Sequence, residues 1–177
     1  MADDDERQRR ASKIRLILLD VDGVLTDGRI HVNDEGIESR AFDARDGLGI
    51  KLGQMGGLTF GIISGRESPL VEKRARELGI DEIHQRIRDK LGRAREIQAR
   101  LDVKADAVCY VGDDLVDLPL MRAVGFAAAP ADAVAEAQAV AHLVTAKNGG
   151  RGAVREVIDR VLHASGRWDD VTRHYYE

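Results

Sequence analysis

The chain has very little cysteine and no long apolar run. Its one cysteine, Cys109, excludes an internal disulfide, and the apolar residues around it favour a buried, reduced thiol. No stretch approaches the length of a membrane span, and residues 1–13 are charged and lack the apolar segment of a signal peptide. We therefore expect a cytoplasmic protein with a short flexible leader over residues 1–13.

An excess of charge of one sign is also absent. The formal net charge is -4, and acidic and basic residues are interspersed along the 177 residues. This balance gives no reason to expect nucleic acid or a membrane as a partner, and we predict neither. Chemistry on a small molecule stays open, and the length suits a single domain with a genuine core.

The sequence does contain a regular alternation of short apolar runs and helical patterns. Runs of strand length cover residues 14–19, 58–63, 107–111, 125–128 and 142–144, with a weaker one at 82–85. Patterns typical of helices cover residues 47–55, 68–78, 90–101, 115–123, 133–139 and 152–164. This alternation predicts one α/β domain over residues 14–164, with a Rossmann-like, doubly wound, mostly parallel sheet and helices on both faces.

One stretch breaks this alternation. Residues 29–32 and 37–42 alternate apolar and polar side chains around a polar turn, which predicts an inserted β-hairpin over residues 29–42. A two-stranded ribbon is marginal alone, so we expect it to pack against a partner surface, such as the same ribbon of another subunit. Residues 165–177 form a polar tail with aromatic residues, which indicates that the tail docks on a surface.

Polar side chains stand where the predicted strands end. In chain order these are Asp20, Asp22, Ser64, Lys90, Asp113 and Asp114. Because open α/β sheets bind ligands outside the carboxyl ends of their strands, we expect these groups to converge on one crevice. Several carboxylates suit Mg²⁺, whereas the histidines and the cysteine match no zinc spacing. An Asp-x-Asp pair alone is more often a helix cap or a solvated turn, so the hypothesis depends on the whole set.

With a metal and a phosphate in such a crevice, each group has a chemical role. A carboxylate that attacks phosphorus forms an aspartyl-phosphate and splits a difficult hydrolysis into two displacements. Ser64 and Lys90 would hold phosphoryl oxygens as charge shifts in the transition state. Asp22 is the candidate acid that protonates the leaving alkoxide and then, as the conjugate base, activates water.

These motifs resemble those of the haloacid dehalogenase superfamily of phosphohydrolases. The resemblance is carried, in order, by Asp20-Val21-Asp22-Gly23-Val24, Ile62-Ile63-Ser64-Gly65-Arg66, Lys90, and Gly112-Asp113-Asp114 with Asp117. It implies that Asp20 is the nucleophile, that Asp22 is the acid and base, and that Ser64 and Lys90 anchor phosphate. It also implies a Mg²⁺ site made by Asp20, the backbone carbonyl of Asp22, and Asp113, with Asp117 as a second-layer or alternative ligand.

A narrower resemblance is to the 3-deoxy-D-manno-octulosonate 8-phosphate phosphatases of lipopolysaccharide biosynthesis. It is carried by residues 23–28, 42–50, 112–121 and 149–156. That family lacks a cap domain and closes its sites by forming a homotetramer through the hairpin. It implies that the substrate, an acidic sugar phosphate, contacts Asp22, Asp43, Ala44, Arg45, Asp46, Gly47, Lys51, Arg66, Arg74 and Lys90. Two departures are Lys51, where arginine is common, and residues 85–89, where the family often has a glycine-containing turn.

Other interpretations stay open at this point. The same clamps would serve another acidic sugar phosphate, such as an acylneuraminate 9-phosphate. A non-catalytic phospho-acceptor module also pairs aspartates with a serine and a lysine, although its acceptor lies on a later strand. A catalytically idle subunit is a third alternative, but no required group is missing. Arg74 and the arginines that flank Lys90 (Arg86, Arg88, Arg93 and Arg95) also suit solvated surfaces.

Overall fold

The fold is built on one parallel sheet. The computed structural model describes residues 2–177, and its main sheet has the strand order β5-β4-β1-β6-β7-β8, with every neighbouring pair parallel. The strands are β1 (Leu16–Leu19), β4 (Thr59–Ile63), β5 (Glu82–His84), β6 (Val108–Val111), β7 (Phe126–Ala129) and β8 (Leu143–Val144). Strands β4 and β5 lie on one side of β1, and the later strands β6, β7 and β8 lie on the other side. The predicted doubly wound sheet is confirmed.

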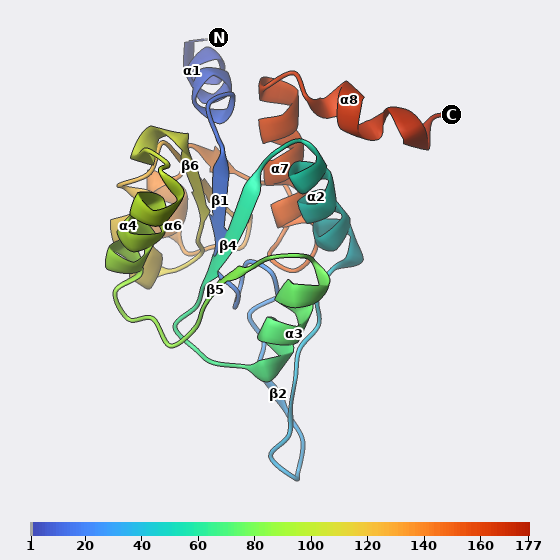
Figure 1. The fold of residues 1–177 in the computed structure, drawn as a ribbon. Coiled ribbons are helices and arrows are strands. Elements are labelled where there is room, and N and C mark those ends of the chain that lie inside the picture. Colours follow the sequence, from blue (N-terminus) through green and yellow to red (C-terminus); the bar gives the residue numbers. More distant parts are fainter. Residues whose placement is uncertain (1) are drawn as a thin grey trace.

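Helices cover both faces of this sheet (Figure 1). Their bounds are α1 (Ala2–Ala11), α2 (Ala44–Met55), α3 (Pro69–Glu77), α4 (Lys90–Leu101), α5 (Leu118–Met121), α6 (Ala135–Val140), α7 (Ala153–Ala164) and α8 (Trp168–Thr172). Short 3-10 helices lie at η1 (Ala105–Ala107), η2 (Leu115–Asp117) and η3 (Arg173–Tyr175). Among the described residues, no helix has the length and apolar character needed to cross a membrane.

The sheet is apolar on both faces because each face has its own core. In β1, Ile17 and Leu19 join the core beneath α2, α3 and α7, whereas Leu16 and Leu18 join the core beneath α4, α5 and α6. This alternation follows from the two-residue period of a strand. It explains why β1 appears in the sequence as a continuous apolar run and not as an alternating one.

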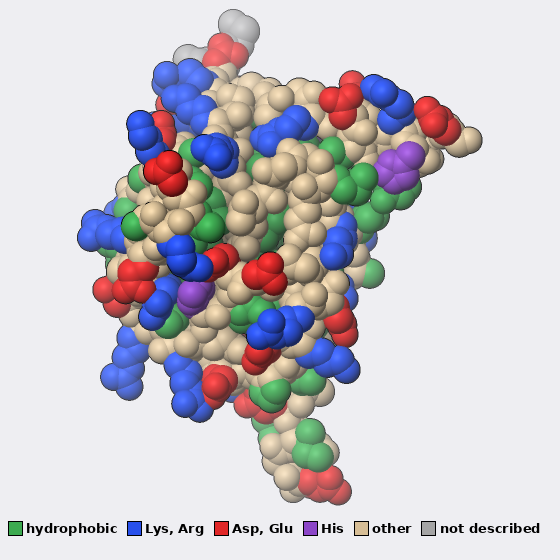
Figure 2. Space-filling model, in the orientation of Figure 1, with side chains coloured by type: hydrophobic (Ala, Val, Ile, Leu, Met, Phe, Trp, Pro, Cys, Tyr) green, Lys and Arg blue, Asp and Glu red, His purple; other side chains and the backbone are tan. Residues whose placement is uncertain are grey.

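The inserted hairpin is present and projects from the end of the molecule at which β1 finishes (Figure 1). Its strands are β2 (His31–Val32) and β3 (Glu38–Ser39), which pair antiparallel. Ile30, Val32 and Ile37 are 48%, 57% and 59% exposed, so the ribbon has no apolar partner surface within the described chain. Figure 2 shows hydrophobic and acidic side chains on the projecting ribbon. No cap domain accompanies it in the part of the chain that the structure describes.

The N-terminal segment differs from the flexible leader expected over residues 1–13. Met1 lies outside the described residues, but Ala2–Ala11 form α1. An ion pair from Arg10 Nε to Glu6 Oε1 at 2.8 Å joins successive turns, and the Arg10 guanidinium donates to the Gly125 carbonyl at 3.0 Å. Ala11 is fully buried in the core. A charged segment without an apolar stripe therefore still folds, because its last residues dock on the domain.

The C-terminal tail also forms helical structure that the sequence did not predict, α8 and η3. Trp168 stacks on His163 of α7 with ring centroids 4.5 Å apart, and Arg167 donates to the Gly56 carbonyl at 2.6 Å. The first part of the tail therefore docks on its own chain. Tyr175 and Tyr176 remain 56% and 81% exposed at the far end, which points away from the domain (Figure 1).

Candidate active site

The predicted catalytic residues come together at the carboxyl ends of β1, β4 and β6. Asp20 follows β1, Ser64 follows β4 and Asp113 follows β6. The chain continues from β1 to β4 on one side and from β6 to β7 on the other. The carboxyl ends of the neighbouring strands β1 and β6 therefore form the topological switch point, where open α/β sheets bind ligands. A pocket of about 400 Å³ opens there, lined by Asp20, Asp22, Ser64, Gly65, Arg66, Ile87, Arg88, Lys90, Asp113, Asp114 and Val116.

Asp20 is 7% exposed and its carboxylate is held at both oxygens. The backbone N–H of Val21 donates to Oδ1 at 2.7 Å, and Lys90 Nζ lies 2.8 Å from Oδ2. Burial raises the pKa of Asp20 to about 6, with the Lys90 charge opposing this effect and the Asp117 carboxylate adding to it. Near neutral pH the group is therefore a fixed carboxylate at the floor of the pocket, oriented by its neighbours.

Lys90 is the centre of a buried polar network. Its Nζ lies 2.6 Å from Asp117 Oδ1 and 3.3 Å from the Tyr110 hydroxyl, in addition to the Asp20 contact. Burial lowers the pKa of Lys90, but Asp20 and Asp117 outweigh burial, and the pKa lies above its ordinary value. Lys90 therefore remains an ammonium group within the pocket wall, suited to meet negative charge on a phosphoryl group.

Asp117 supports this network more than it faces the pocket. Its Oδ1 also accepts a hydrogen bond of 2.6 Å from the Tyr110 hydroxyl, and its Oδ2 accepts from the N–H groups of Asp113 and Asp114 at 2.9 and 3.2 Å. The side chain is fully buried. Because both oxygens of Asp117 are already occupied, its arrangement favours the second-layer role over that of a primary metal ligand.

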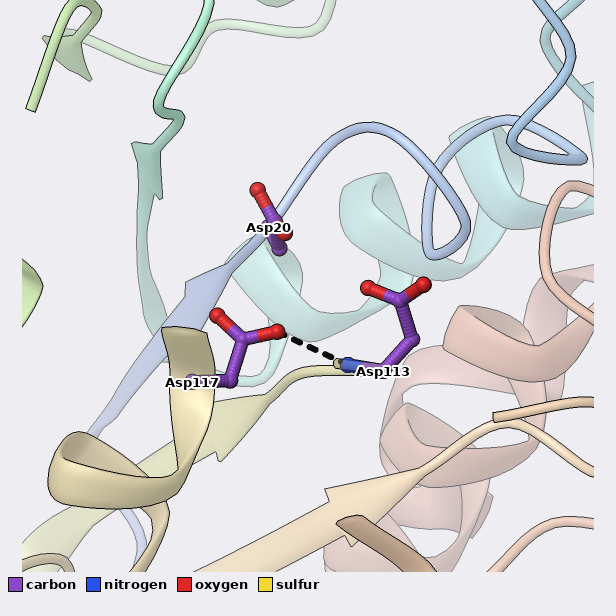
Figure 3. A group of neighbouring side chains, drawn as sticks. All are labelled: Asp20, Asp113 and Asp117. Carbon is purple, nitrogen blue, oxygen red and sulfur yellow. Dashed lines mark hydrogen bonds between the residues drawn. The ribbon is translucent and has the colours of Figure 1, made fainter. Parts of the chain in front are cut away.

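Asp113 has the opposite character. Its Oδ1 is buried and has no hydrogen-bond partner among the described residues. One carboxylate oxygen from each of Asp20, Asp113 and Asp117 lies within 4.8 Å of the others (Figure 3). Burial, followed by repulsion from Asp20 and Asp117, raises the pKa of Asp113 to about 7. An orphaned acceptor beside a second carboxylate fits a hard divalent cation such as Mg²⁺.

Gly23 allows the two halves of this cluster to approach. Its φ is +88°, and a Cβ at this position would lie 2.0 Å from Asp113 Oδ2. The carboxylate of Asp113 points toward the loop that follows Asp20 (Figure 3). Only glycine combines this backbone conformation with such a close approach, so the residue after Asp22 is a packing requirement of the site.

Asp22 faces the pocket between two arginines. Arg40 Nη1 donates to its Oδ1, and Arg66 Nε lies 3.9 Å from its Oδ2. The Asp22 side chain is 25% exposed, in contrast to the buried Asp20. One carboxylate is therefore fixed at the floor of the pocket and the other stands at its wall, which suits a nucleophile and an acid-base group respectively.

Ser64 and Arg66 form the opposite wall. Ser64 is 3% exposed, and its hydroxyl oxygen accepts from the Arg66 N–H at 3.3 Å. The Arg66 guanidinium is half-exposed, and its Nη2 donates to Glu38 of the hairpin at 2.7 Å. Both side chains line the pocket, as predicted for groups that hold an anion.

The remaining predicted substrate contacts do not line this pocket within one chain. Asp43 caps α2 by accepting from the Arg45 N–H at 2.7 Å, and Ala44 is exposed beside it. Asp46 is buried and accepts from the N–H groups of Gly152 and Arg155 at 3.3 and 2.7 Å, so it caps α7 from a distance.

Gly47 lies against Arg74, and Lys51 lies on the outer side of α2. A Cβ at Gly47 would be 2.5 Å from Arg74 Nη2, and both residues line a separate small crevice between α2 and α3. Lys51 is exposed. These positions, unlike Arg66 and Lys90, do not line the active-site pocket of their own chain.

Three residues of the site escaped the sequence analysis. Arg40 binds Asp22 from the returning strand of the hairpin, Tyr110 binds Lys90 and Asp117 from β6, and Arg88 lines the pocket. Arg88 is exposed, as expected for a surface arginine, and it also lines the pocket. The strand period could place Tyr110 on the face of the sheet opposite to Cys109 and Val111, where α4 packs, but it could not give the contacts of its hydroxyl. The path of the hairpin, and so the position of Arg40, had no signal in the sequence.

Comparison with known proteins decides the family. A model of haloacid dehalogenase-like hydrolases matches residues 79–158. The 3-deoxy-D-manno-octulosonate 8-phosphate phosphatase of Yersinia pestis is 44% identical over 168 residues, which cover 95% of this chain and 90% of that protein. The Escherichia coli K12 phosphatase is also 44% identical, over 161 residues that cover 91% and 86% of the two chains. The chain belongs to the 3-deoxy-D-manno-octulosonate 8-phosphate phosphatase family.

Solved structures of this phosphatase family share the fold. The Moraxella catarrhalis phosphatase, crystallised with magnesium, phosphate and KDO, has a TM-score of 0.94 at 38% identity and covers 97% of this chain and 98% of its own. The Yersinia pestis phosphatase has a TM-score of 0.90 at 44% identity, covering 92% and 88%. The predicted resemblance, the α/β fold and the phosphatase class are confirmed. The role of each site residue stays a prediction.

Proposed function

We propose that this protein is a Mg²⁺-dependent phosphatase that hydrolyses 3-deoxy-D-manno-octulosonate 8-phosphate to the sugar acid and inorganic phosphate. The observation that carries the proposal is the pocket in which Asp20, Lys90, Ser64 and Asp113 converge. A relative of the same fold and family has been crystallised with magnesium, phosphate and KDO, which are the cofactor and the two products of this reaction.

In the proposed reaction, Asp20 attacks phosphorus and forms an aspartyl-phosphate. Its Oδ2 is bound by Lys90 and its Oδ1 by the Val21 N–H, so the carboxylate needs no reorientation before attack. Lys90 and Ser64 then stabilise charge on the phosphoryl oxygens as the ester bond breaks.

Asp22 completes both half-reactions. Its partly exposed carboxylate stands at the pocket wall, where it gives a proton to the leaving sugar alkoxide. The resulting carboxylate then takes a proton from the water that attacks the aspartyl-phosphate, which returns Asp20 to its starting state. The two aspartates therefore divide nucleophilic and acid-base work according to their burial.

Asp20, Asp113 and the backbone carbonyl of Asp22 would hold the Mg²⁺. The fit is supported by the buried Asp113 Oδ1 that has no hydrogen-bond partner among the described residues. Bound Mg²⁺ supplies positive charge that reduces the repulsion between these carboxylates and the phosphate dianion. Asp117 would orient the Asp113 backbone, because its Oδ2 accepts a hydrogen bond of 2.9 Å from the Asp113 N–H.

A homotetramer is part of this proposal. The exposed apolar hairpin and the positions that do not line the pocket of their own chain support it. In such an assembly Asp43, Ala44, Arg45, Asp46, Gly47, Lys51 and Arg74 would serve the substrate of a neighbouring subunit. Cations in this set suit a sugar-acid carboxylate. The buried, unpaired Cys109 supports a reducing, cytoplasmic setting.

The test is turnover on two esters measured side by side with Mg²⁺. We expect 3-deoxy-D-manno-octulosonate 8-phosphate to be hydrolysed with a higher kcat/KM than an acylneuraminate 9-phosphate. The opposite order would overturn the choice of substrate. A stable phosphorylated protein without release of inorganic phosphate would instead favour the non-catalytic phospho-acceptor.

A further inference from the structure

Four side chains of alternating charge form a closed ring between the hairpin and the active-site pocket. Its members are Asp22, Arg40, Glu38 and Arg66. Arg40 Nη1 donates to Asp22 Oδ1, and Arg40 Nη2 lies 3.6 Å from Glu38 Oε2. Arg66 closes the ring, with Nη2 at 2.7 Å from Glu38 Oε1 and Nε at 3.9 Å from Asp22 Oδ2. Strand β3 of the hairpin and the residue that follows it thus contribute half of the ring.

Arg40 is the buried member. Its side chain is 3% exposed, whereas that of Arg66 is 44% exposed. Its Nε and Nη2 are buried without hydrogen-bond partners among the described residues, so Asp22 accepts the hydrogen bond that its guanidinium makes there. Burying a charged guanidinium with unsatisfied N–H groups is costly, and the hydrogen bond to Asp22, with the longer ion pair to Glu38, offsets this cost. The contact with Asp22 therefore dictates where Arg40 lies.

Arg40 does not reach the pocket itself. The residues that line the pocket include Asp22 and Arg66 but not Arg40 or Glu38. Any effect of Arg40 on the reaction must therefore pass through its two partners: directly through Asp22, or through Glu38 to Arg66. By holding Oδ1 from behind, Arg40 leaves Oδ2 as the oxygen beside the pocket-lining Arg66.

We infer that Arg40 is a positioning residue that orients Asp22 for proton transfer, and that the hairpin is an active part of the catalytic site as well as a surface for assembly. The inference rests on the proposed reaction, in which Asp22 protonates the leaving group. Glu38 has the matching task of holding Arg66 at the pocket wall. The hairpin therefore fixes two of the side chains that meet the substrate.

The test compares Arg40→Gln with Arg29→Gln as a matched control. Arg29 lies at the start of the same hairpin, is exposed, and makes no ion pair among the described residues. The readout is kcat/KM for two aryl esters. Phenyl phosphate releases phenolate, a poor leaving group that needs a proton, whereas p-nitrophenyl phosphate releases p-nitrophenolate, which needs little protonation. A general acid contributes about 10²–10⁴-fold in rate. Misplacing it should therefore slow hydrolysis of the ester with the poor leaving group more than hydrolysis of the other ester.

For Arg40→Gln we expect kcat/KM to fall about tenfold or more on phenyl phosphate and less than about threefold on p-nitrophenyl phosphate. Arg40→Lys restores most of the rate, since one N–H donor suffices for Asp22 Oδ1. Glu38→Gln raises KM for the sugar phosphate with little change in kcat. Arg29→Gln matches the wild type throughout.

Equal losses on both aryl esters for Arg40→Gln, or wild-type rates on both, would overturn the inference. Thermal unfolding of each variant shows whether a loss comes from the fold, and Arg40→Lys keeps the buried charge in place. Aryl esters need no recognition of the sugar. Failure of the wild type on the sugar phosphate alone would therefore overturn the proposed substrate and leave the result for Arg40 intact.

Discussion

At the scale of single residues, Asp113 connects the electrostatics of the site to its metal. Its buried Oδ1 lacks a hydrogen-bond partner among the described residues, and its pKa is raised to about 7 by burial and by neighbouring carboxylates. Asp20 beside it has a pKa raised to about 6. A metal must displace any proton on these groups before it binds, so protons and Mg²⁺ compete for the same oxygens.

The first prediction concerns this competition. Mg²⁺ should raise the Tm of the protein clearly at about pH 8 and much less at about pH 5.5, because Asp113 and Asp20 are largely protonated at the lower pH. In the metal-free protein, raising the pH should lower the stability contributed by these two groups. The native state binds these protons more tightly than the unfolded chain, so their contribution to stability falls as pH rises from about 4 to about 7.

Differential scanning fluorimetry with and without Mg²⁺ measures both effects. Asp113→Asn removes one ligand and should abolish the Mg²⁺-dependent rise in Tm at either pH. A rise of equal size at both pH values in the wild type would contradict the assignment of Asp20 and Asp113 as ligands.

The sequence allowed the acidic residues of the site to be predicted because each follows an apolar run. The parallel sheet then brings strand ends together without further information, as it does for Asp20 and Asp113. Arg40 could not be found this way, since its contact with Asp22 depends on how the hairpin returns to the domain. Side-chain networks such as that of Tyr110 depend on distances of tenths of an ångström, which periodicity does not supply.

At the scale of elements, the glycine-rich loop before α7 supports the loop that follows β1. The Gly150 N–H donates to the Val24 carbonyl at 2.9 Å, and a Cβ on Gly150 would lie 2.4 Å from the Thr26 carbonyl carbon. The buried Asp46 holds the adjacent end of α7 through the Gly152 and Arg155 N–H groups. The loop that follows Asp22 is therefore pressed against a rigid backbone surface.

The second prediction uses two glycines of similar conformation. Gly150 and Gly166 have φ of +61° and +68°, but a Cβ on Gly166 meets nothing within 4 Å. Both Gly→Ala variants should lose about 1 kcal/mol of unfolding free energy from backbone strain, and Gly150→Ala should lose more because its Cβ clashes with the Thr26 backbone. Gly150→Ala should also lower kcat about tenfold or more, because it displaces the loop after Asp22.

Denaturant unfolding and steady-state kinetics separate these contributions. Equal kcat values for Gly150→Ala and Gly166→Ala would show that the contact between the two loops has no part in catalysis.

Element boundaries show where sequence patterns stop being informative. The predicted helix over residues 115–123 is divided into η2 and α5, because Asp117 turns inward to bind Lys90 and the backbone of Asp113. The helix at 90–101 was predicted with its observed ends, since Asp89 caps it by accepting from the Gly92 N–H at 2.8 Å. Helix α1 was missed because its charged sequence has no apolar stripe.

At the scale of the whole molecule, the hairpin is the feature whose apolar side chains find no partner surface within the described chain. It exposes Ile30, Val32 and Ile37 on a ribbon that projects from the domain (Figure 1). Two-stranded ribbons are marginal in water, so an apolar partner would stabilise this one. A second copy of the chain is the partner we propose.

The third prediction follows from this surface. A variant with Ile30→Ser, Val32→Ser and Ile37→Ser should form a smaller assembly than the wild type, and its activity on the sugar phosphate should fall. Sedimentation velocity measures the size. Met55→Ser, at an exposed apolar position on α2, is the control and should keep the wild-type size. A hairpin variant that kept both size and activity would contradict assembly through the ribbon.

The central claim is phosphoryl transfer to Asp20, and release of inorganic phosphate by Asp20→Asn tests it most directly. The substitution keeps the shape of the side chain but leaves only one acceptor for the Val21 N–H and Lys90, so thermal unfolding is measured as well to show that the variant is folded. With Mg²⁺ and 3-deoxy-D-manno-octulosonate 8-phosphate, the account predicts that kcat falls by about 10⁴-fold or more, because the nucleophile is lost. A kcat within about tenfold of the wild type in a folded variant would contradict covalent catalysis by Asp20.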